Sequence, residues 1–398
     1  MNDSTNSWVF ILFSGLLYWL AHSLTRPLIA LHAQSLGMTE AEIGMVVGVY
    51  AVLPFLLAIP SGGIADKIGR VKVLRFGSVL MLLSGAFYML SSNIYFLFVG
   101  QIFAGFGQML VWLVIQVMIT TEKTKQSERI ASFTLYTTLG QVLGPLIGGF
   151  LTEKFHMGVN FGVYTLFSFI LVVFAFQLKE PNRPILTTKM NIKKMYGSSL
   201  LLLRNKGILA TLLCTFIALF ILDARMTFLP IYLQDIGITP FQIGLLISIG
   251  ACSALFIKPI YPALIKYFGY KILLIITFII SLSLLFLTPV LNQFYSFAVL
   301  LVVSGLALGI NQPLSLSMIS DQTEDSERGI AIGLRLMANR LSQLLDPFMF
   351  GMLTLVFGLK ISFILIGFFL LLLSILTITL LHYEEKKHQV AKLNENAL

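Results

Sequence analysis

Residues 62–74 read GGIADKIGRVKVL and lie between two long apolar runs. An α-helix needs about 20 mostly apolar residues to cross the hydrocarbon core of a bilayer. Working outward from this basic segment, we count twelve such runs, at about 7–31, 43–65, 76–93, 95–120, 131–152, 158–178, 207–233, 242–265, 272–290, 294–320, 330–357 and 359–382. The sequence therefore predicts an all-α polytopic membrane protein with twelve transmembrane helices.

The overall composition agrees with a membrane protein and excludes several other classes. Of the 398 residues, 57% are hydrophobic and 11% are charged, against about 25% charged in an average soluble domain. A nucleic-acid-binding protein would carry its basic residues on a polar scaffold, and here they stand between apolar runs. Cys214 and Cys252 form no metal or disulfide pattern, and no ATP-binding P-loop occurs. We expect no metal, no cofactor, no nucleic-acid partner and no enzymatic activity.

The basic residues indicate how the chain is oriented. Cytoplasmic loops of membrane proteins are enriched in Lys and Arg. With the N-terminus inside, 20 of the 27 basic residues fall in cytoplasmic segments, and only Lys154 and Lys360 fall outside. We therefore expect a multi-pass protein of the plasma membrane with both termini in the cytoplasm. The remaining five basic residues lie inside predicted spans: Arg26, Arg225, Lys258, Arg335 and Arg340.

The two halves of the chain repeat one another at an offset of about 200 residues. The segment from Gln34 to Gly44 shares its Gln, Gly, Thr and Ile-Gly positions with the segment from Gln234 to Gly244. Ordered matches of this kind indicate duplication of a six-helix unit. We expect a six-helix bundle at 1–178, a cytoplasmic loop at 179–206, a second bundle at 207–382 and a cytoplasmic tail at 383–398.

Together, the basic segment, the twelve spans and the repeat resemble the major facilitator superfamily. Its loop signature is matched throughout except at Val71, where a basic residue is usual. The resemblance implies two pseudo-symmetric six-helix bundles around a central cavity, with a loop that contacts the other half and holds the inner side closed. The residues expected to form this contact are Gly62, Asp66, Lys67, Gly69, Arg70 and Glu122.

The fifth predicted span resembles the antiporter signature of drug–proton exporters in that superfamily. Its residues Gly140, Gly144, Pro145, Gly148 and Gly149 combine closely spaced small residues with a proline. Small residues let helices approach closely, and proline frees a backbone carbonyl. Generic close packing is the alternative interpretation. The fourth span departs from the pattern, because Gln101 stands where the family often has an arginine.

Polar residues inside spans are costly and therefore mark candidate sites. They concentrate in spans 1, 4, 7 and 10, whereas spans 3, 6, 9 and 12 contain no charge or amide away from their ends. In the superfamily, the helices corresponding to these four line the central cavity. The candidate cavity residues are Tyr18, His22, Arg26, Gln101, Gln108, Trp112, Asp223, Arg225, Asn311, Gln312, Arg340 and Asp346.

Arg26, Asp223, Arg225 and Asp346 reach a similar depth from the inner side of the predicted spans. We hypothesise that they form a charge network whose pairing changes between states, so that a carboxylate that loses its partner binds a proton. A static salt bridge is the alternative. His22 is a second candidate proton carrier, unless it is simply a packed residue.

These features predict a monomeric secondary transporter of a small amphipathic organic molecule that works by alternating access. The resemblance favours proton-coupled efflux of a drug or metabolite. The alternatives are proton-coupled uptake of a small metabolite and, from another class, a membrane sensor or scaffold that does not transport. Because basic residues inside the spans outnumber acidic ones, the composition favours an anionic or zwitterionic substrate over a simple cation.

Overall fold

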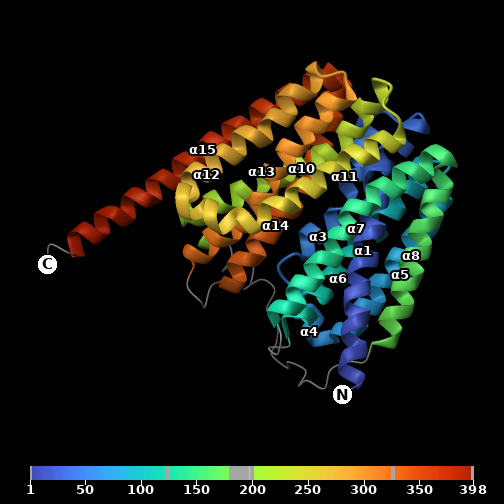
Figure 1. Cartoon of the computed structure of the whole chain (residues 1–398), viewed down its shortest axis with the longest axis horizontal. Helices are drawn as coiled ribbons and strands as arrows, with labels where there is room; N and C mark the ends of the chain where they lie inside the picture. Colours follow the sequence, from blue (N-terminus) through green and yellow to red (C-terminus); the bar gives the residue numbers. More distant parts are fainter. Residues whose placement is uncertain (1, 122–125, 179–196, 198–200, 324–327, 396–398) are drawn as a thin grey trace.

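The computed structural model describes all residues except 1, 122–125, 179–196, 198–200, 324–327 and 396–398. Within this part of the chain, all regular elements are helices, which form two bundles lying side by side (Figure 1). The first bundle consists of α1 (Asn2–Ser35), α2 (Glu40–Val49), α3 (Val52–Leu57), α4 (Ser61–Ile68), α5 (Arg70–Met89), α6 (Ile94–Thr121), α7 (Gln126–Lys154) and α8 (Met157–Gln177). The second consists of α10 (Lys206–Asp235), α11 (Pro240–Ile257), α12 (Tyr261–Leu287), α13 (Phe294–Asp321), α14 (Arg328–Phe357) and α15 (Leu359–Glu395), with short 3₁₀ turns at 258–260 and 288–290.

All twelve predicted spans fall on these helices, which confirms the predicted all-α membrane architecture. Nine segments of the described chain are long and apolar enough to cross a membrane, and one of them joins α11 to α12. The bounds differ in places. The second span is divided into α2, α3 and α4 near Pro54 and Pro60, because proline cannot donate a backbone hydrogen bond within a helix. The last helix continues to Glu395, beyond the predicted end at 382.

The repeat extends to local backbone conformation. Gly37 and Gly237 have positive φ angles of 76° and 87°, and Gly69 and Gly269 have 108° and 69°. These left-handed conformations suit glycine, because it has no Cβ. After the first pair, Thr39 caps α2 and Thr239 caps α11, each in a capping box with the third residue of its helix. The turns at 36–39 and 236–239 are therefore equivalent structures.

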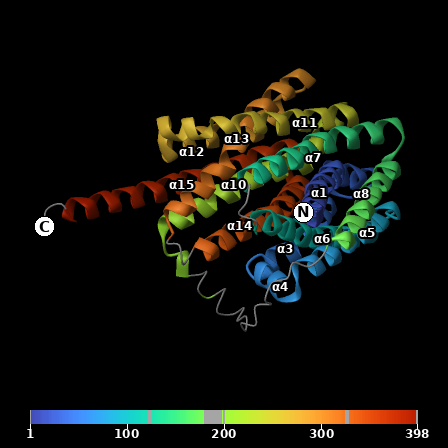
Figure 2. The same cartoon turned by 60° about the horizontal axis from the view of Figure 1, so that its bottom comes forward.

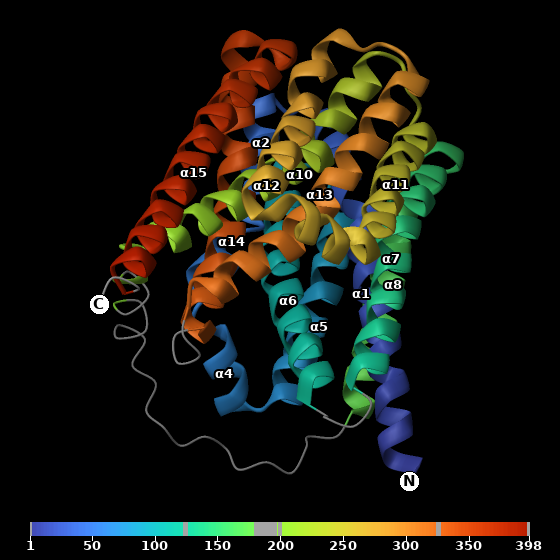
Figure 3. The same ribbon diagram turned by 60° about the vertical axis from the view of Figure 1, so that its left-hand side comes forward.

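The halves meet through pseudo-symmetric helix pairs at the end of the molecule that carries these two turns, which we call the closed end. Helix α7 packs on α11, α2 on α14 and α1 on α10. Figure 2 and Figure 3 both show α7 beside α11. Nearer the opposite end, Ile59 packs against a hydrophobic cluster of the second half that includes Ile208 and Leu334.

Two glycines allow the closest approach between the halves. A Cβ on Gly244 would lie 3.0 Å from the carbonyl carbon of Pro145, and one on Gly44 would lie 3.1 Å from that of Pro347. In both cases the carbonyl oxygen would be closer still. Ordinary contact distances are 3.4–4 Å, so a larger side chain at either glycine would force the helices apart.

Polar contacts also join the halves at the closed end. The Gln34 side chain donates to Asp235 Oδ1 at 3.0 Å, and Ser248 Oγ donates to the Val142 carbonyl at 2.6 Å. Glu153, beyond the predicted fifth span, accepts a hydrogen bond from the backbone N–H of Phe241 at 2.9 Å. Hydrogen bonds from the Thr239 side chain and from this N–H lower the pKa of the Glu153 carboxyl group. Its carboxylate thus binds the N-terminus of α11.

A candidate substrate cavity between the halves

A cavity of about 460 Å³, including its mouth, lies between the two bundles. Both halves contribute to its lining: His22, Thr25, Arg26, Ile29, Val47, Tyr50, Tyr88, Gln101, Ala104, Gln108, Thr227, Gln343 and Pro347. Among these described lining residues, only Arg26 has a side chain that is charged at neutral pH.

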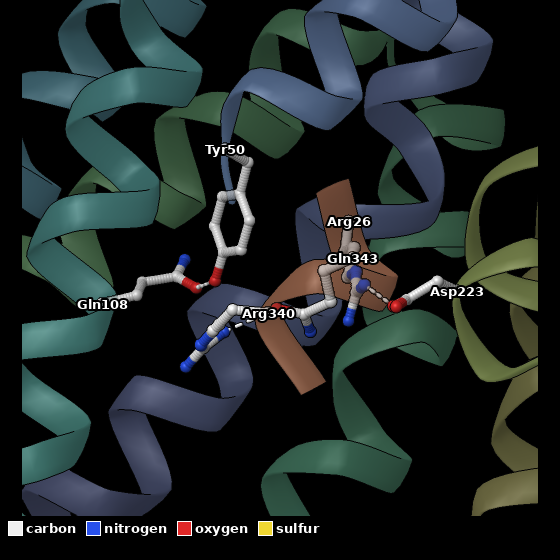
Figure 4. A network of polar contacts seen from close by, with 6 residues as sticks. All are labelled: Arg26, Tyr50, Gln108, Asp223, Arg340 and Gln343. Atoms are coloured by element: carbon white, nitrogen blue, oxygen red, sulfur yellow. Dashed lines mark hydrogen bonds and ion pairs between the residues drawn. The ribbon is translucent and has the colours of Figure 1, made fainter. Parts of the chain in front are cut away.

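Arg26 and Asp223 form an ion pair that crosses from α1 to α10 (Figure 4). The guanidinium donates to Asp223 Oδ1, and the second oxygen, Oδ2, is buried without a hydrogen-bond partner. The Arg26 side chain is 19% exposed, whereas that of Asp223 is 1% exposed. The pair therefore presents its cation to the cavity and keeps its anion behind the wall.

A second carboxyl group lies near this ion pair. Asp346 of α14 is completely buried, and neither of its oxygens has a hydrogen-bond partner. It lies within electrostatic range of Asp223 and Arg26. Six residues earlier, Arg340 donates to Gln343 at 2.6 Å, and its charge also acts on Tyr50. Three of the four residues of the predicted charge network are therefore brought together.

Arg225, the fourth, lies elsewhere. Only 3% of Arg225 is exposed, and its Nη1 lies against Gly250 of α11. Its Nε and Nη1 have no hydrogen-bond partner. The reason is helical geometry, because residues two apart on a helix point about 200° apart. Arg225 therefore points away from the Arg26–Asp223 pair.

Aromatic and amide side chains of the first half form the opposite wall of the cavity. Tyr50 donates to Gln108 at 2.5 Å (Figure 4), and Tyr88 donates to Gln101 at 2.9 Å. The Gln101 amide that replaces the usual arginine is thus bound to a tyrosine hydroxyl.

Tyr50, Tyr88 and His22 line the cavity, whereas the predicted cavity residues Tyr18 and Trp112 lie behind them, outside its lining. Tyr18 and Trp112 are stacked, with centroids 5.3 Å apart and planes at 17°. His22 lies between Tyr18 and Tyr50, at centroid distances of 6.1 and 6.0 Å. The wall offers flat aromatic surface together with fixed polar groups.

The candidates from the tenth predicted span lie apart from this cavity. Asn311 is buried and accepts a hydrogen bond from Thr277 of α12 at 3.4 Å. Gln312 is exposed and does not line the cavity. Sequence reasoning did not single out Tyr50, Tyr88 or Gln343, which do line it. A tyrosine inside an apolar run was the available signal for the first two.

The motif in the fifth span serves two interfaces. Gly140, Gly144 and Gly148 face Trp19, Ser23 and Leu24 of α1 within the first half. Gly149 faces Pro240 and Phe241 of the second half, and the Pro145 carbonyl faces Gly244. The motif therefore holds α7 against α1 and lets α11 approach it across the closed end.

The predicted inner contact is only partly described. Gly69 separates α4 from α5 with its positive φ angle, and Lys67 is exposed. Gly62 and Asp66 belong to α4, but their surroundings lie outside the described residues, as does Glu122. Arg70 begins α5. The contact with the second half stays a prediction.

Comparison with known proteins identifies the family. The sequence profile of the Major Facilitator Superfamily matches residues 11–235 and 211–397. The quinolone resistance protein NorA of Staphylococcus aureus (strain COL) is 23% identical over 355 residues, which cover 87% of this chain and 90% of NorA.

Two solved structures share the fold. A variant of the nucleoside transporter NupG superposes with a TM-score of 0.82 at 14% identity, covering 94% of this chain and 99% of NupG. A bacterial homologue of the lysosomal transporter Spinster, in an inward-facing and unoccupied conformation, gives a TM-score of 0.75 at 14% identity and covers 94% and 96%. The profile matches both halves, and transport rather than catalysis is the shared activity, as the sequence predicted. The chain belongs to the major facilitator superfamily.

Proposed function

We propose that this chain is a proton-coupled secondary transporter that moves a small amphipathic organic molecule across the plasma membrane as a monomer. The observation that carries the proposal is the Arg26–Asp223 ion pair, which joins the two halves at the wall of the cavity. A relative movement of the halves would alter this pair, and a buried carboxylate that loses its counter-charge binds a proton readily. The same ion pair would therefore respond to substrate binding, to proton binding and to the movement of the halves.

With the predicted orientation, the closed end faces the exterior, and the cavity communicates with the cytoplasm. The packing of α7 on α11 and of α2 on α14 supports an inward-facing state. The outward-facing state would require these pairs to separate and the basic loop around Gly69 to contact the second half. We propose that the chain alternates between these two states.

Export is the direction that the relatives favour. The matching protein of Staphylococcus aureus is named for quinolone resistance, and the motif at Gly140–Gly149 resembles that of drug–proton exporters. A cavity lined by aromatic rings and amides suits an amphipathic organic molecule.

Uptake is the second candidate, and the charge of the cavity favours it. Arg26 offers its cation to the cavity, while Asp223 and Asp346 are buried behind the wall. A cationic drug would meet no exposed acidic side chain among the described lining residues. An anion that binds there would promote binding of a proton to the buried carboxyl groups, as in a symporter.

Everted and right-side-out membrane vesicles with an imposed pH gradient test both the function and its direction. An exporter accumulates substrate in everted vesicles that are acidified inside, and the accumulation disappears when the gradient is collapsed. Asp223→Asn should lose gradient-driven accumulation but keep substrate exchange. Wild-type coupling in Asp223→Asn would exclude the proton role, and uptake confined to right-side-out vesicles would exclude export.

A further inference from the structure

We infer that the substrate is an organic acid, that Arg26 is the receptor for its carboxylate, and that Asp223 takes up a proton when the substrate replaces it. This inference rests on the proposed transport function and names the substrate class of the same cavity. The substrate that it specifies is a flat, aromatic monocarboxylate. Its acid group would lie at α1 and its ring against the aromatic wall of the first half.

The exposed fractions of the charged side chains indicate the charge of the ligand. An ion pair at a binding site can offer its cation, its anion or neither. Here the Arg26 side chain is 19% exposed, Asp223 is 1% exposed and Asp346 is fully buried. A ligand entering the cavity therefore meets a guanidinium and no carboxylate among the described lining residues. The site attracts an anion and repels an ammonium group.

The chemistry of arginine permits the exchange. A guanidinium has five N–H donors in a planar fork, and Arg26 uses one nitrogen for Asp223 Oδ1. Its exposed part can bind an incoming carboxylate through two parallel hydrogen bonds. The incoming acid then competes with Asp223 for the same cation.

The groups around Asp223 determine whether it binds a proton after this exchange. Besides Arg26 of α1, the charged or titratable groups that act on it are Arg340 and Asp346 of α14, and Tyr50. Arg340 donates to the neutral amide of Gln343, and among the described residues only Arg26 forms an ion pair with Asp223. Asp346 is an acid within electrostatic range of Asp223, and its oxygens have no hydrogen-bond partner. A buried carboxylate that loses its ion-pair partner near a second acid is costly. Protonation of Asp223 by a proton from solution removes this cost, at one proton for each acid bound.

The ring of the substrate has a defined place. Of the aromatic side chains that line the cavity, Tyr50 is half-buried, and the His22 ring lies 6.0 Å from it. Gln108 and Tyr50 fix one another by a 2.5 Å hydrogen bond, so these polar groups need no partner from the ligand. An aromatic body fits here better than a sugar or another polyhydroxylated molecule.

Acid and proton would therefore bind to the same state and cross the membrane together. This is the coupling of the uptake candidate, since an inward proton gradient would drive the acid inward. An antiporter, which exchanges its substrate for a proton, requires a coupling free energy of the opposite sign, so that binding of the substrate opposes binding of the proton.

Three ligands of the same ring and different charge test the inference: indole-3-acetate, indole-3-acetamide and tryptamine. Binding to the purified full-length protein is measured by calorimetry, with 2-naphthoate and 2-naphthamide as a second pair. We expect both acids to bind at least tenfold more tightly than the matched amides and amine. Because this comparison uses the unaltered chain, it does not depend on the folding of a variant.

Variants then assign the preference to Arg26. Arg26→Gln should lose at least tenfold in affinity for the acids, and Arg26→Lys should recover part of it. Lys360→Gln, which removes an exposed cation at the closed end, should bind as the wild type does. In weakly buffered solution, the wild type should take up about one proton per acid bound, and Asp223→Asn should bind the acid without proton uptake.

Several outcomes would overturn the inference. They are amide or amine binding equal to that of the acids, no binding of either acid, full affinity in Arg26→Gln, or acid binding without proton uptake by the wild type. If vesicles nevertheless accumulate the amine or another cation along a pH gradient, the proposed transport function stands and only the substrate class is wrong. If no compound is moved by the gradient although the acids bind, the transport function fails and the anion site stands.

Discussion

Replacing Gly244 by alanine should shift the protein away from the state in which the closed end is closed. The new Cβ would lie 3.0 Å from the Pro145 carbonyl carbon, where ordinary contacts are 3.4–4 Å. Helices α7 and α11 would have to separate by at least 3.4 − 3.0 = 0.4 Å, and by more to clear the carbonyl oxygen. Inserting a methyl group into a close-packed site costs about 1–3 kcal/mol. Because the contact exists only when the closed end is closed, the ratio of states should change about 5- to 150-fold.

Double electron–electron resonance measures this change. Spin labels at Lys154→Cys and Lys360→Cys stand on different halves near the closed end, after replacement of Cys214 and Cys252. Gly244→Ala should add a long-distance component to the distribution.

The matched control is Gly162→Ala in α8, where an added Cβ meets nothing within 4 Å. It should leave the distances unchanged. Gly44→Ala, at the pseudo-symmetric position, should reproduce the effect of Gly244→Ala. A distance distribution for Gly244→Ala that matches the Gly162→Ala control would refute the reasoning that this contact stabilises the state with the closed end closed.

Three further predictions concern single side chains. Tyr50→Phe removes a 2.5 Å hydrogen bond and should weaken substrate binding about 2- to 13-fold, corresponding to about 0.5–1.5 kcal/mol; unchanged affinity in a binding titration would show that Gln108 needs no support. Arg225→Met removes a buried guanidinium whose Nε and Nη1 lack partners and should raise the melting temperature; a lower melting temperature would reveal a stabilising partner. Because the pKa of Glu153 is lowered, its contact with α11 is fully present above the ordinary Glu pKa and weakens as the pH falls through the lowered value. Acidification should therefore lengthen the closed-end distance in the wild type, whereas in Glu153→Gln the distance should not respond to pH through this group.

The number and type of helices could be predicted because span length follows from bilayer thickness and apolar runs are local. The offset of 200 residues matched Gly37 with Gly237, and the structure gives both the same left-handed conformation. The contacts of Gly44 with Pro347 and of Gly244 with Pro145 could not be predicted in this way. They depend on how two bundles align, and small residues are common in membrane helices without marking a particular partner.

Part of the candidate site could also be derived from the sequence. Arg26 and Asp223 stood out because charges are costly inside spans, and the structure joins them. Depth alone also placed Arg225 in the network, although the helical period puts it on another face. Tyr50 was missed because it lies where the second span breaks between α2 and α3, a break that counting apolar residues does not reveal. The orientation, the domain bounds and the coupling proton stay predictions.

The two halves share their turns and helix packing but differ in the charged residues that form the ion pair. At the offset of 200, Met226 stands opposite Arg26 and Ser23 opposite Asp223, and at the offset of 202, Gly144 stands opposite Asp346. Two copies of the first unit would supply two arginines with no partner, and two copies of the second would supply only the acids. A symmetric dimer of either present-day half could therefore not form this ion pair. The pair depends on the difference between the two halves, and the scaffold around it depends on their likeness.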